Sequence, residues 1–403
     1  MSERRPPRVF SIPAGVPFLP ALADAVLHGT LVPEFAWSGD PLTLADTTIF
    51  VPTRRAARAL RSTFAERLGG RAIVLPTVRP LGEFDEDEAA FDAASADELD
   101  LLPPIAPLER LLRLAPLVRA WKSRLPAHIA EKFEEEVTVP ASAADSIWLA
   151  RDLARLIDEI ETEGADWTKL VGLVPGNLAG WWQVTLDFLN IVIRLWPDAL
   201  AELQRSNPAA HRDALLRREA RRFARAAAKG QVIAAGSTGS IPATAELLSI
   251  IARLPNGAVV LPGLDTELDD RSWAVLGATS PHPSVCGHPQ FGLARLLKVF
   301  GLGRGDVTGI GSQHDGLVAR ATILSETMKP AETTDDWVAS RAAIDGRFEP
   351  ALADVTLIEA ANEREEAAAI AVALRGAIVE PGATTALVTA DRELARRVSA
   401  ELL

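Results

Sequence analysis

The chain has 403 residues, 48% of them hydrophobic, and a mean hydropathy of +0.11, so it can bury a large core and is expected to form two to three domains. Its net charge of -12 excludes a surface that is basic throughout, and any contact with nucleic acid must come from local basic faces. The single cysteine, Cys286, excludes a disulfide framework, and the sequence has no run of about 18 apolar residues. We therefore expect a soluble, cytoplasmic protein that makes no membrane contact.

The sequence begins with a predicted strand over residues 8–12, a turn over 13–18 and an Ala- and Leu-rich helix over 19–27. A phosphate-binding loop occupies this place in nucleotide-handling α/β folds, because the amides at a helix start hold phosphate. The turn, however, consists of Pro13, Ala14, Gly15, Val16 and Pro17. Its two prolines remove two amides, and it lacks the Lys and Ser/Thr of the pattern GxxxxGK[ST]. The architecture suggests a nucleotide site, whereas the residues argue against one, and no cofactor is expected in this chain.

The next elements predict a parallel sheet. A strand over 48–51 is followed by a helix over 54–68, which Gly69 and Gly70 end, and by a third strand over 72–75. Nine carboxylates and no Lys or Arg then occupy residues 83–100. The run 85–88 (Asp-Glu-Asp-Glu) could hold a divalent metal, but adjacent residues on one loop rarely converge, and we interpret the segment as a solvated domain exit.

Residues 104–228 show helical periodicity and no convincing strand. Apolar positions with a 3.6-residue period include Leu108, Leu111, Leu112 and Val118 in one helix, and 147–160 in a second, which contains Trp148. A third predicted helix carries three tryptophans and ends at Pro197. Core packing and stacking on nucleic-acid bases are the alternatives for these tryptophans, Trp181, Trp182 and Trp196, and the periodicity favours the core.

The last helix of this block, over 211–229, has the most concentrated positive face in the chain. Arg217, Arg221 and Arg225 repeat at i, i+4 and i+8, with Arg218 and Arg222 beside them. Two interpretations stay open: a solvated face paired with neighbouring carboxylates, or a contact with a phosphate backbone or a protein partner.

Strands resume after this helix. A strand over 231–235 leads into a small-residue turn with Gly236, Ser237 and Thr238, then a helix over 243–254 and a strand over 258–261. The helical block, residues 96–228, is thus predicted to be an insertion in one α/β domain formed by 1–95 and 229–345. The turn 236–240 is the remaining candidate for phosphate contact, with a plain tight connection as the alternative.

Residues 266–345 are predicted to be rich in loops. His282, Cys286 and His288 could be zinc ligands, but three candidates among prolines without a fourth favour an ordinary loop, and no metal site is assigned. Residues 346–403 predict strands over 353–358 and 385–388, alternating with helices over 362–375 and from 391 onward. No Gly, Asn or Pro follows the last helix, so we expect the start of a second α/β domain of a longer chain.

Several strings, in this order and spacing, resemble one family. They are SIPAGVPF at 11–18, VPTRRAARAL at 51–60, RPLGEFDEDE at 79–88, VLPGLD at 260–265, HPQFGLARLL at 288–297 and ALVTADRELARR at 386–397. Together with the split α/β domain they resemble superfamily 1 helicases and are similar to the AddB family of AddAB helicase-nucleases, in its alphaproteobacterial form.

The resemblance implies two RecA-like (P-loop NTPase-like) domains, the second starting at residue 346, and a role in double-strand-break repair by homologous recombination. It implies DNA ends, single strands and an AddA-type motor subunit as partners, with nuclease carboxylates and any iron-sulfur cysteines beyond Leu403. In this setting the turn 13–17 is the relic of a nucleotide site. The motor would supply ATP hydrolysis, and no ATPase or nuclease activity is expected in these residues.

In helicases of this class the segment after the first helix of the α/β domain contacts single-stranded DNA, so the resemblance implies a DNA contact at Pro52, Thr53, Arg54, Arg55 and Arg58. Cations at a helix start are disfavoured by the dipole unless an anion is near, and a solvated helix start is the alternative. Arg392 matches an arginine that faces nucleotide in active relatives, and without a phosphate loop we expect it to serve structure.

Two other functions compete with this one. The first is an active ATP-binding helicase or NTPase that uses 236–240 as a non-standard phosphate loop. The second is an unrelated Rossmann-type metabolic enzyme, which lacks a GxGxxG fingerprint and would leave the basic helix unexplained.

Overall fold

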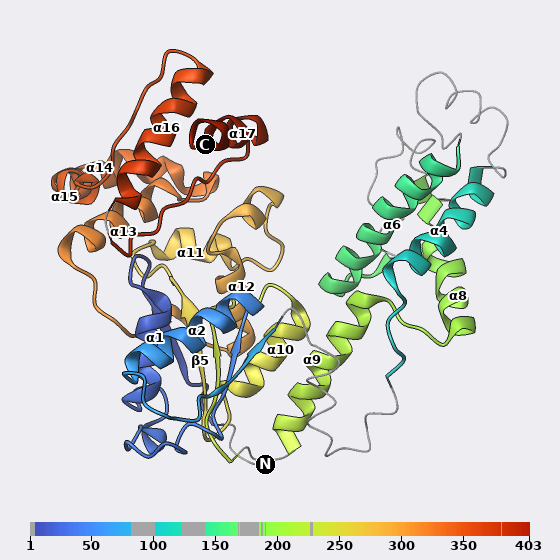
Figure 1. The fold of residues 1–403 in the computed structure, drawn as a ribbon, viewed down its shortest axis with the longest axis horizontal. Coiled ribbons are helices and arrows are strands. Elements are labelled where there is room, and N and C mark those ends of the chain that lie inside the picture. Colours follow the sequence, from blue (N-terminus) through green and yellow to red (C-terminus); the bar gives the residue numbers. More distant parts are fainter. Residues whose placement is uncertain are drawn as a thin grey trace.

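The computed structural model describes residues 5–81, 101–122, 142–167, 169, 185–186, 188–189, 191–225, 229–379 and 381–403. Their fold is α/β, as predicted (Figure 1). It is built on a six-stranded parallel sheet of order β3-β2-β4-β5-β1-β6. The strands are β1 (Val9–Ile12), β2 (Thr48–Val51), β3 (Thr77–Pro80), β4 (Val232–Ala235), β5 (Gly257–Pro262) and β6 (Thr308–Gly309).

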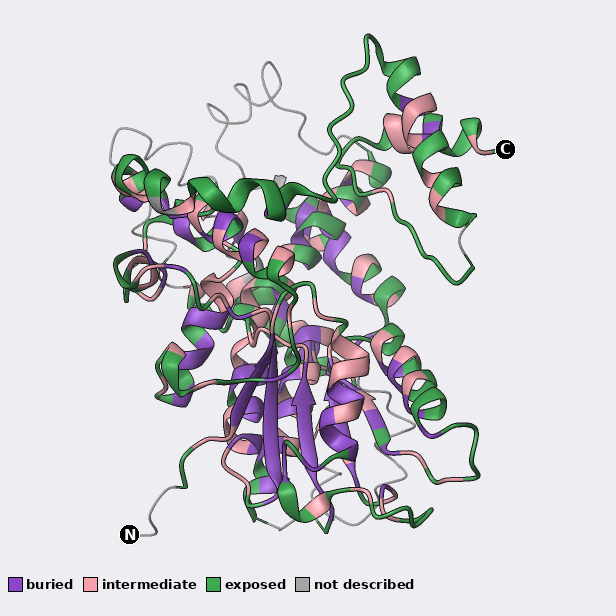
Figure 2. Ribbon diagram, turned by 90° about the vertical axis from the view of Figure 1, so that its left-hand side faces the viewer, coloured by how far each residue is buried: buried purple, intermediate pink, exposed green. Residues whose placement is uncertain are grey.

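Alternate side chains of the strands enter two separate apolar layers, because successive residues of a strand point to opposite faces. Ile12, Ile49 and Ile233 pack on one face under α1 (Phe18–Leu27) and α2 (Arg54–Arg67). The opposite face, which includes Phe50 and Ala234, packs under α9 (Pro208–Arg225), α10 (Pro242–Ile251) and α12 (Phe291–Phe300). The central strands are buried along their length (Figure 2), so the sheet is the core of a three-layer unit.

The third strand lies further along the chain than predicted. Residues 72–75 are not in the sheet, and Val74 is half exposed with its amide donating to Pro41 O at 3.0 Å. The strand is instead β3, where Val78 is 1% exposed and its carbonyl accepts from Arg61 Nη2 at 2.7 Å. β3 is an edge strand, and Pro80 is tolerated there because one side needs no ladder hydrogen bond.

The described residues of the helical block form their own core. It contains α4 (Pro107–Lys122), α6 (Ala143–Glu163), a π-helical turn (Ile191–Leu195) and α8 (Trp196–Leu203). Trp196 is 1% exposed, as predicted, whereas Trp181 and Trp182 lie outside the described residues. Pro197 lies in the first turn of α8 rather than ending a helix, and a proline is tolerated there because the amides of a first turn lack helical partners.

Three positions assigned to the core by periodicity are on the surface. Leu108 and Leu112 of α4 and Trp148 of α6 are 69%, 55% and 63% exposed. The guanidinium of Arg151 stacks over the Trp148 ring, 4.7 Å from its centroid. The buried stripe of α4 contacts α6 and keeps Val118 of the predicted positions, with Leu114 in place of Leu108 and Leu112.

A buried polar group lies where the block meets α9. Asn207 accepts from Trp196 Nε1 at 2.9 Å and donates to Glu161 Oε1 at 2.7 Å. Burial raises the pKa of Glu161, against the opposing effects of the Asn207 hydrogen bond and of Arg110. Nearby, the chain enters and leaves the block side by side, since residues Pro104 and Ser206 form a parallel bridge. Beyond that bridge, α9 runs from the block to the sheet.

Residues 266–345 are largely helical, so the prediction of a loop-rich segment was wrong. The helices are short, and side-chain caps such as Asp269 and His314 start them, which leaves little periodicity to detect. The α-helices are α11 (Asp270–Leu276), α12, α13 (Asp315–Thr327) and α14 (Trp337–Ile344). Short 3-10 turns cover Pro283–Gly287 (η6), Arg304–Asp306 (η7), Ala331–Asp336 (η8) and Asp345–Arg347 (η9), and another, Pro33–Phe35 (η1), precedes β2.

The C-terminal helices are present, but the two strands predicted beside them are not. After α15 (Phe348–Leu352) come α16 (Glu363–Ile378) and α17 (Arg392–Glu401). Residues 355–360 and 383–389 have no regular secondary structure and are largely exposed, with Leu357 at 84% and Val388 at 93%. A strand needs a neighbouring strand for its backbone groups, and no described segment supplies one to either run. Across the described residues, no helix is long and apolar enough to span a membrane.

Candidate nucleic-acid interface at the carboxyl edge of the sheet

The strand order creates two positions where a ligand could enter the carboxyl edge of the sheet. β1 and β2 are followed by α1 and α2 on one face, whereas β4 is followed by α10 on the other face and β5 leads towards α12 on that same face. β1 is paired with β5 and β2 with β4, so each pair is a point at which the covering helices diverge. Ligands of open α/β sheets bind at such points.

The turn after β1 is filled by other parts of the chain. Gly15 has a φ of +84°, and a Cβ placed on it would lie 2.7 Å from a methyl carbon of Leu317. Gln313 Nε2 donates to Ala14 O at 2.8 Å, and Gly263 N, at the end of β5, donates to Ile12 O at 2.8 Å. Side chains at and just before the start of α13 therefore lie against the turn 13–17.

The start of α2, after β2, is open by comparison. Thr53 caps the helix, its Oγ1 accepting from Ala56 N at 3.1 Å. The side chains of Thr53, Arg54, Arg55 and Arg58 are exposed, and the first turn carries no acidic residue. Because the positive end of the helix dipole disfavours cations, this arrangement suits an anion placed over the helix start.

The turn after β4 lies directly beside this helix start. A Cβ on Gly236 would be 3.4 Å from the ring of Phe18 and 3.5 Å from Pro52. Within the turn, Gly239 N donates to Ser237 Oγ at 3.2 Å, and a Cβ on Gly239 would clash with Leu296 of α12 at 2.6 Å. The structure thus brings Pro52–Arg55 and the turn 236–240 together, with the turn packed between α1 and α12.

The basic helix α9 does not join this edge. It packs on the sheet face opposite α2, through Phe223, whose ring lies 6.0 Å from that of Phe50. Several of its arginines have acidic partners: Arg217 lies 3.5 Å from Glu246, and Arg222 lies 2.5 Å from Glu219. Arg221 and Arg225 are exposed. The two basic surfaces predicted from the sequence are therefore separate.

The histidines and the cysteine considered as zinc ligands have other roles. His288 Nε2 lies 2.6 Å from Met328 O, and its Nδ1 accepts from Gln290 N at 3.1 Å. His282 Nδ1 pairs with Ser284 Oγ at 2.8 Å, and Cys286 is exposed. Within the part of the chain that the structure describes, no three His, Cys, Asp or Glu residues gather as metal ligands. The acidic run 85–88 lies outside that part.

The sequence did not predict a buried network of charged residues that joins the start of α11 to the end of α13. Lys329, with a side chain 3% exposed, lies 3.2 Å from Asp269 and 2.9 Å from Glu326. Burial opposes ionisation of Asp269, but hydrogen bonds from Ser272 and Lys329 outweigh it and lower its pKa to about 2. Burial likewise acts against the charge of Lys329, and its carboxylate partners reverse the effect and raise its pKa. No sequence spacing signals this network, since Asp269 and Lys329 are 60 positions apart.

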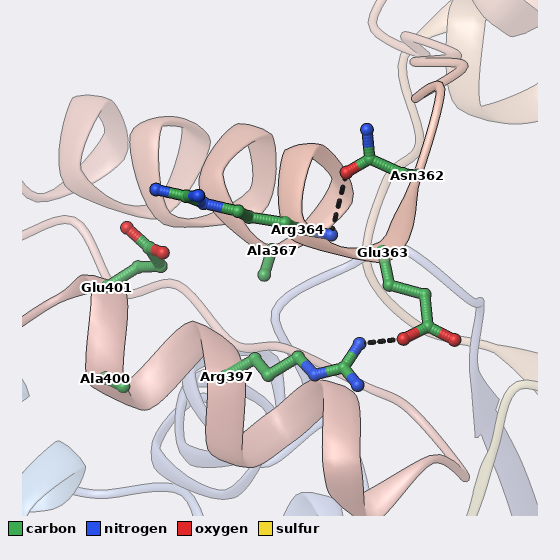
Figure 3. Close-up of a pocket in the computed structure, with 7 residues that line it drawn as sticks. All are labelled: Asn362, Glu363, Arg364, Ala367, Arg397, Ala400 and Glu401. Carbon is green, nitrogen blue, oxygen red and sulfur yellow. Dashed lines mark hydrogen bonds and ion pairs between the residues drawn. The ribbon is translucent and has the colours of Figure 1, made fainter.

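A groove of about 580 Å³ lies between α16 and α17, away from this edge (Figure 3). Ala367 and Ala400 line it, Arg364 extends along it, and Arg397 pairs with Glu363 across it. Arg392, at the exposed start of α17, does not line the groove. The groove is lined by both acidic and basic side chains, so its charge does not favour a nucleotide.

No model of a known protein family matches this chain, and no curated protein matches it either.

Proposed function

We propose that this chain is the helicase-like body of a double-strand-break repair helicase-nuclease subunit, similar to the AddB family, that contacts DNA and a motor subunit without hydrolysing ATP itself. In this proposal, 1–95 and 229–345 form a RecA-like domain, 96–228 are its helical insertion, and 346–403 begin a second RecA-like domain. The cytoplasm is its expected location.

One observation carries the proposal: two turns at the same sheet edge differ in what covers them. The turn after β1, where a phosphate loop belongs, is occupied by Leu317 and Gln313. The start of α2 exposes Arg54, Arg55 and Arg58 under an intact Thr53 cap. These two features fit a helicase-like domain that no longer binds nucleotide after β1 but still contacts the phosphates of DNA at the start of α2.

The geometry at residues 346–403 is compatible with a second domain. Each of the segments 355–360 and 383–389 contains a short run rich in apolar and β-branched residues, as in 355–358 (V-T-L-I), which is the composition of a strand. They flank α16, whose Ala367 and Ala371 are buried while Val372 is 73% exposed. A helix with apolar residues on two sides is expected to cover a sheet as well as a neighbouring helix.

The DNA contact is tested with the double variant Arg54→Ala, Arg55→Ala. Each lost phosphate contact lowers the salt slope of single-strand binding by about 0.7, so the slope should fall by about 1 to 1.5. The measurement is fluorescence anisotropy with a labelled oligonucleotide across a salt series. The control is Arg151→Ala, Arg155→Ala on the exposed side of α6, which removes the same charge elsewhere. An equal slope for the two double variants would return Arg54 and Arg55 to a solvated helix start.

The nucleotide alternative is tested by titrating ATP with Mg²⁺ into the protein by calorimetry. No saturable heat is expected, because the turn after β1 is covered and the turn 236–240 is packed against Leu296. Saturable binding abolished by Ser237→Ala and Thr238→Ala would support an NTPase using that second turn. DNA-stimulated ATP hydrolysis lost on a change at Gly15 would overturn the proposal itself.

A further inference from the structure

Helix α13 crosses the carboxyl side of the sheet and is attached at both ends. Its middle contributes little to a core: Ala319 and Ile323 form a small cluster with Ala351 of α15. Val318 and Leu324 are 40% and 53% exposed. Apart from its contact with α15, the helix buries little apolar surface, so the contacts at its two ends also fix its position on the sheet.

The first attachment is to the turn after β1. Gln313 donates to Ala14 O, and the methyl groups of Leu317 lie against Gly15, where no side chain interferes. Just before the helix, Ile310 N donates to Ser11 O at 2.9 Å, and His314 caps the helix by accepting from Leu317 N. This end of α13 thus rests on backbone that only a glycine at position 15 leaves accessible.

The second attachment is the buried ammonium of Lys329. It bridges Asp269, the N-cap of α11, and Glu326 in the last turn of α13, and it lies 3.3 Å from Ser340 Oγ of α14. Ser272 Oγ contacts Thr333 Oγ1 at 2.7 Å beside it. The ammonium and Glu326 are poorly hydrated, with side chains 3% and 19% exposed, so removing the lysine charge leaves that carboxylate unpaired and the attachment is strong.

The helix also reaches the C-terminal part of the chain. Arg320 Nε donates to Ala351 O at 2.8 Å, and α15 packs along α13. One element therefore contacts the turn after β1, the helix after β5 and the segment that leads to α16 and α17.

We propose that α13 is a strap that couples the turn after β1 to the Lys329 site, so that loosening either end loosens the other and frees the C-terminal segment. The side chains of Gln313 and Leu317 connect the strap to the turn, through the hydrogen bond to Ala14 O and the contact with Gly15. The coupling concerns packing within this chain and does not depend on the proposed role with DNA.

The test is residue-resolved hydrogen exchange of the full chain carrying Lys329→Met, which keeps the apolar stem and removes the charge. Exchange should accelerate about tenfold or more at Met328, near the change, and also at Val318 and Val16, at the far end. The control is Arg271→Ala, which breaks an exposed ion pair between α11 and Asp336 of η8, without touching α13, and should change exchange less than twofold. Acceleration confined to the neighbourhood of Lys329 would overturn the strap.

The reverse experiment uses Gln313→Ala with Leu317→Ala. Coupling between two sites is reciprocal, so the amide of Met328 should exchange faster by a factor similar to that seen at Val318 in the first variant. If circular dichroism shows that the double variant does not fold, Gln313→Ala alone removes one exposed-side hydrogen bond and should still give about threefold at Met328. An unchanged Met328 in the folded variant contradicts the proposal.

Discussion

The turns after β1 and β2 occupy equivalent places and have opposite surroundings. Both leave the carboxyl edge of the same parallel sheet, and both start a helix on the same face. The first is covered by α13 and has prolines on either side of Gly15, whereas the second keeps a Thr cap and exposes arginines. Topology thus provides positions for a phosphate, and the local residues decide which of them remains accessible.

The largest effect should come from a side chain added to the covered turn. Gly15→Ala is expected to lower the free energy of unfolding by about 2 kcal/mol, because a left-handed residue costs about 1 kcal/mol and Leu317 must also move. Gly69→Ala, also left-handed but with nothing within 4 Å, should cost only about 1 kcal/mol. Urea unfolding compares the two, and equal losses would show that Leu317 does not hold the turn.

A smaller loss of stability should come from the charged site at the other end of α13, where Lys329 pairs with Asp269. Asp269 has a lowered pKa, so its contribution is present above its ordinary value of 3.8 and disappears as pH falls through about 2. Allowing for the exposed third of the side chain, Asp269→Asn should cost about 1.5 kcal/mol at pH 7. The gap between the variant and the parent in urea unfolding should close between pH 4 and pH 2. A gap independent of pH would mean that neither the Ser272 hydrogen bonds nor the Lys329 pair stabilises the ionised carboxylate.

The smallest effect should come from the accessible turn. Thr53→Ala removes the side-chain cap of α2 and is expected to cost about 1 kcal/mol in thermal or urea unfolding. Thr53→Ser keeps the hydroxyl and should restore most of the loss. If single-stranded DNA places a phosphate over this helix start, the deficit of Thr53→Ala should shrink in saturating oligonucleotide. A deficit that DNA leaves unchanged would separate the cap from the proposed contact.

Sequence patterns predicted the parts of the fold that depend on local regularity. The strands β1, β2, β4 and β5 and the helices α1, α2, α10 and α16 lie close to the predicted ranges, since continuous apolar runs and capping residues mark them. The failures share a cause. Residues 72–75, 353–358 and 385–388 have strand composition, but pairing is a long-range property that composition does not contain.

The candidate site was likewise predictable only where it depends on local sequence. The exposed arginines at 54, 55 and 58 follow from a helix start after a strand, and the structure places them there. The cover over Gly15 comes from Leu317, about 300 positions away, and the Lys329 network joins residues from three elements. Contacts of such separation leave no local pattern in one sequence.

The bridge between Pro104 and Ser206 has a practical consequence. Since the two ends of the α4–α8 segment meet there, that segment could be excised and its ends rejoined by a few glycines with little loop-closure entropy. The same geometry would let an unrelated domain be grafted in its place, a tolerance usual where termini adjoin. The bridge therefore marks where the chain would be joined in a variant that lacks the α4–α8 segment.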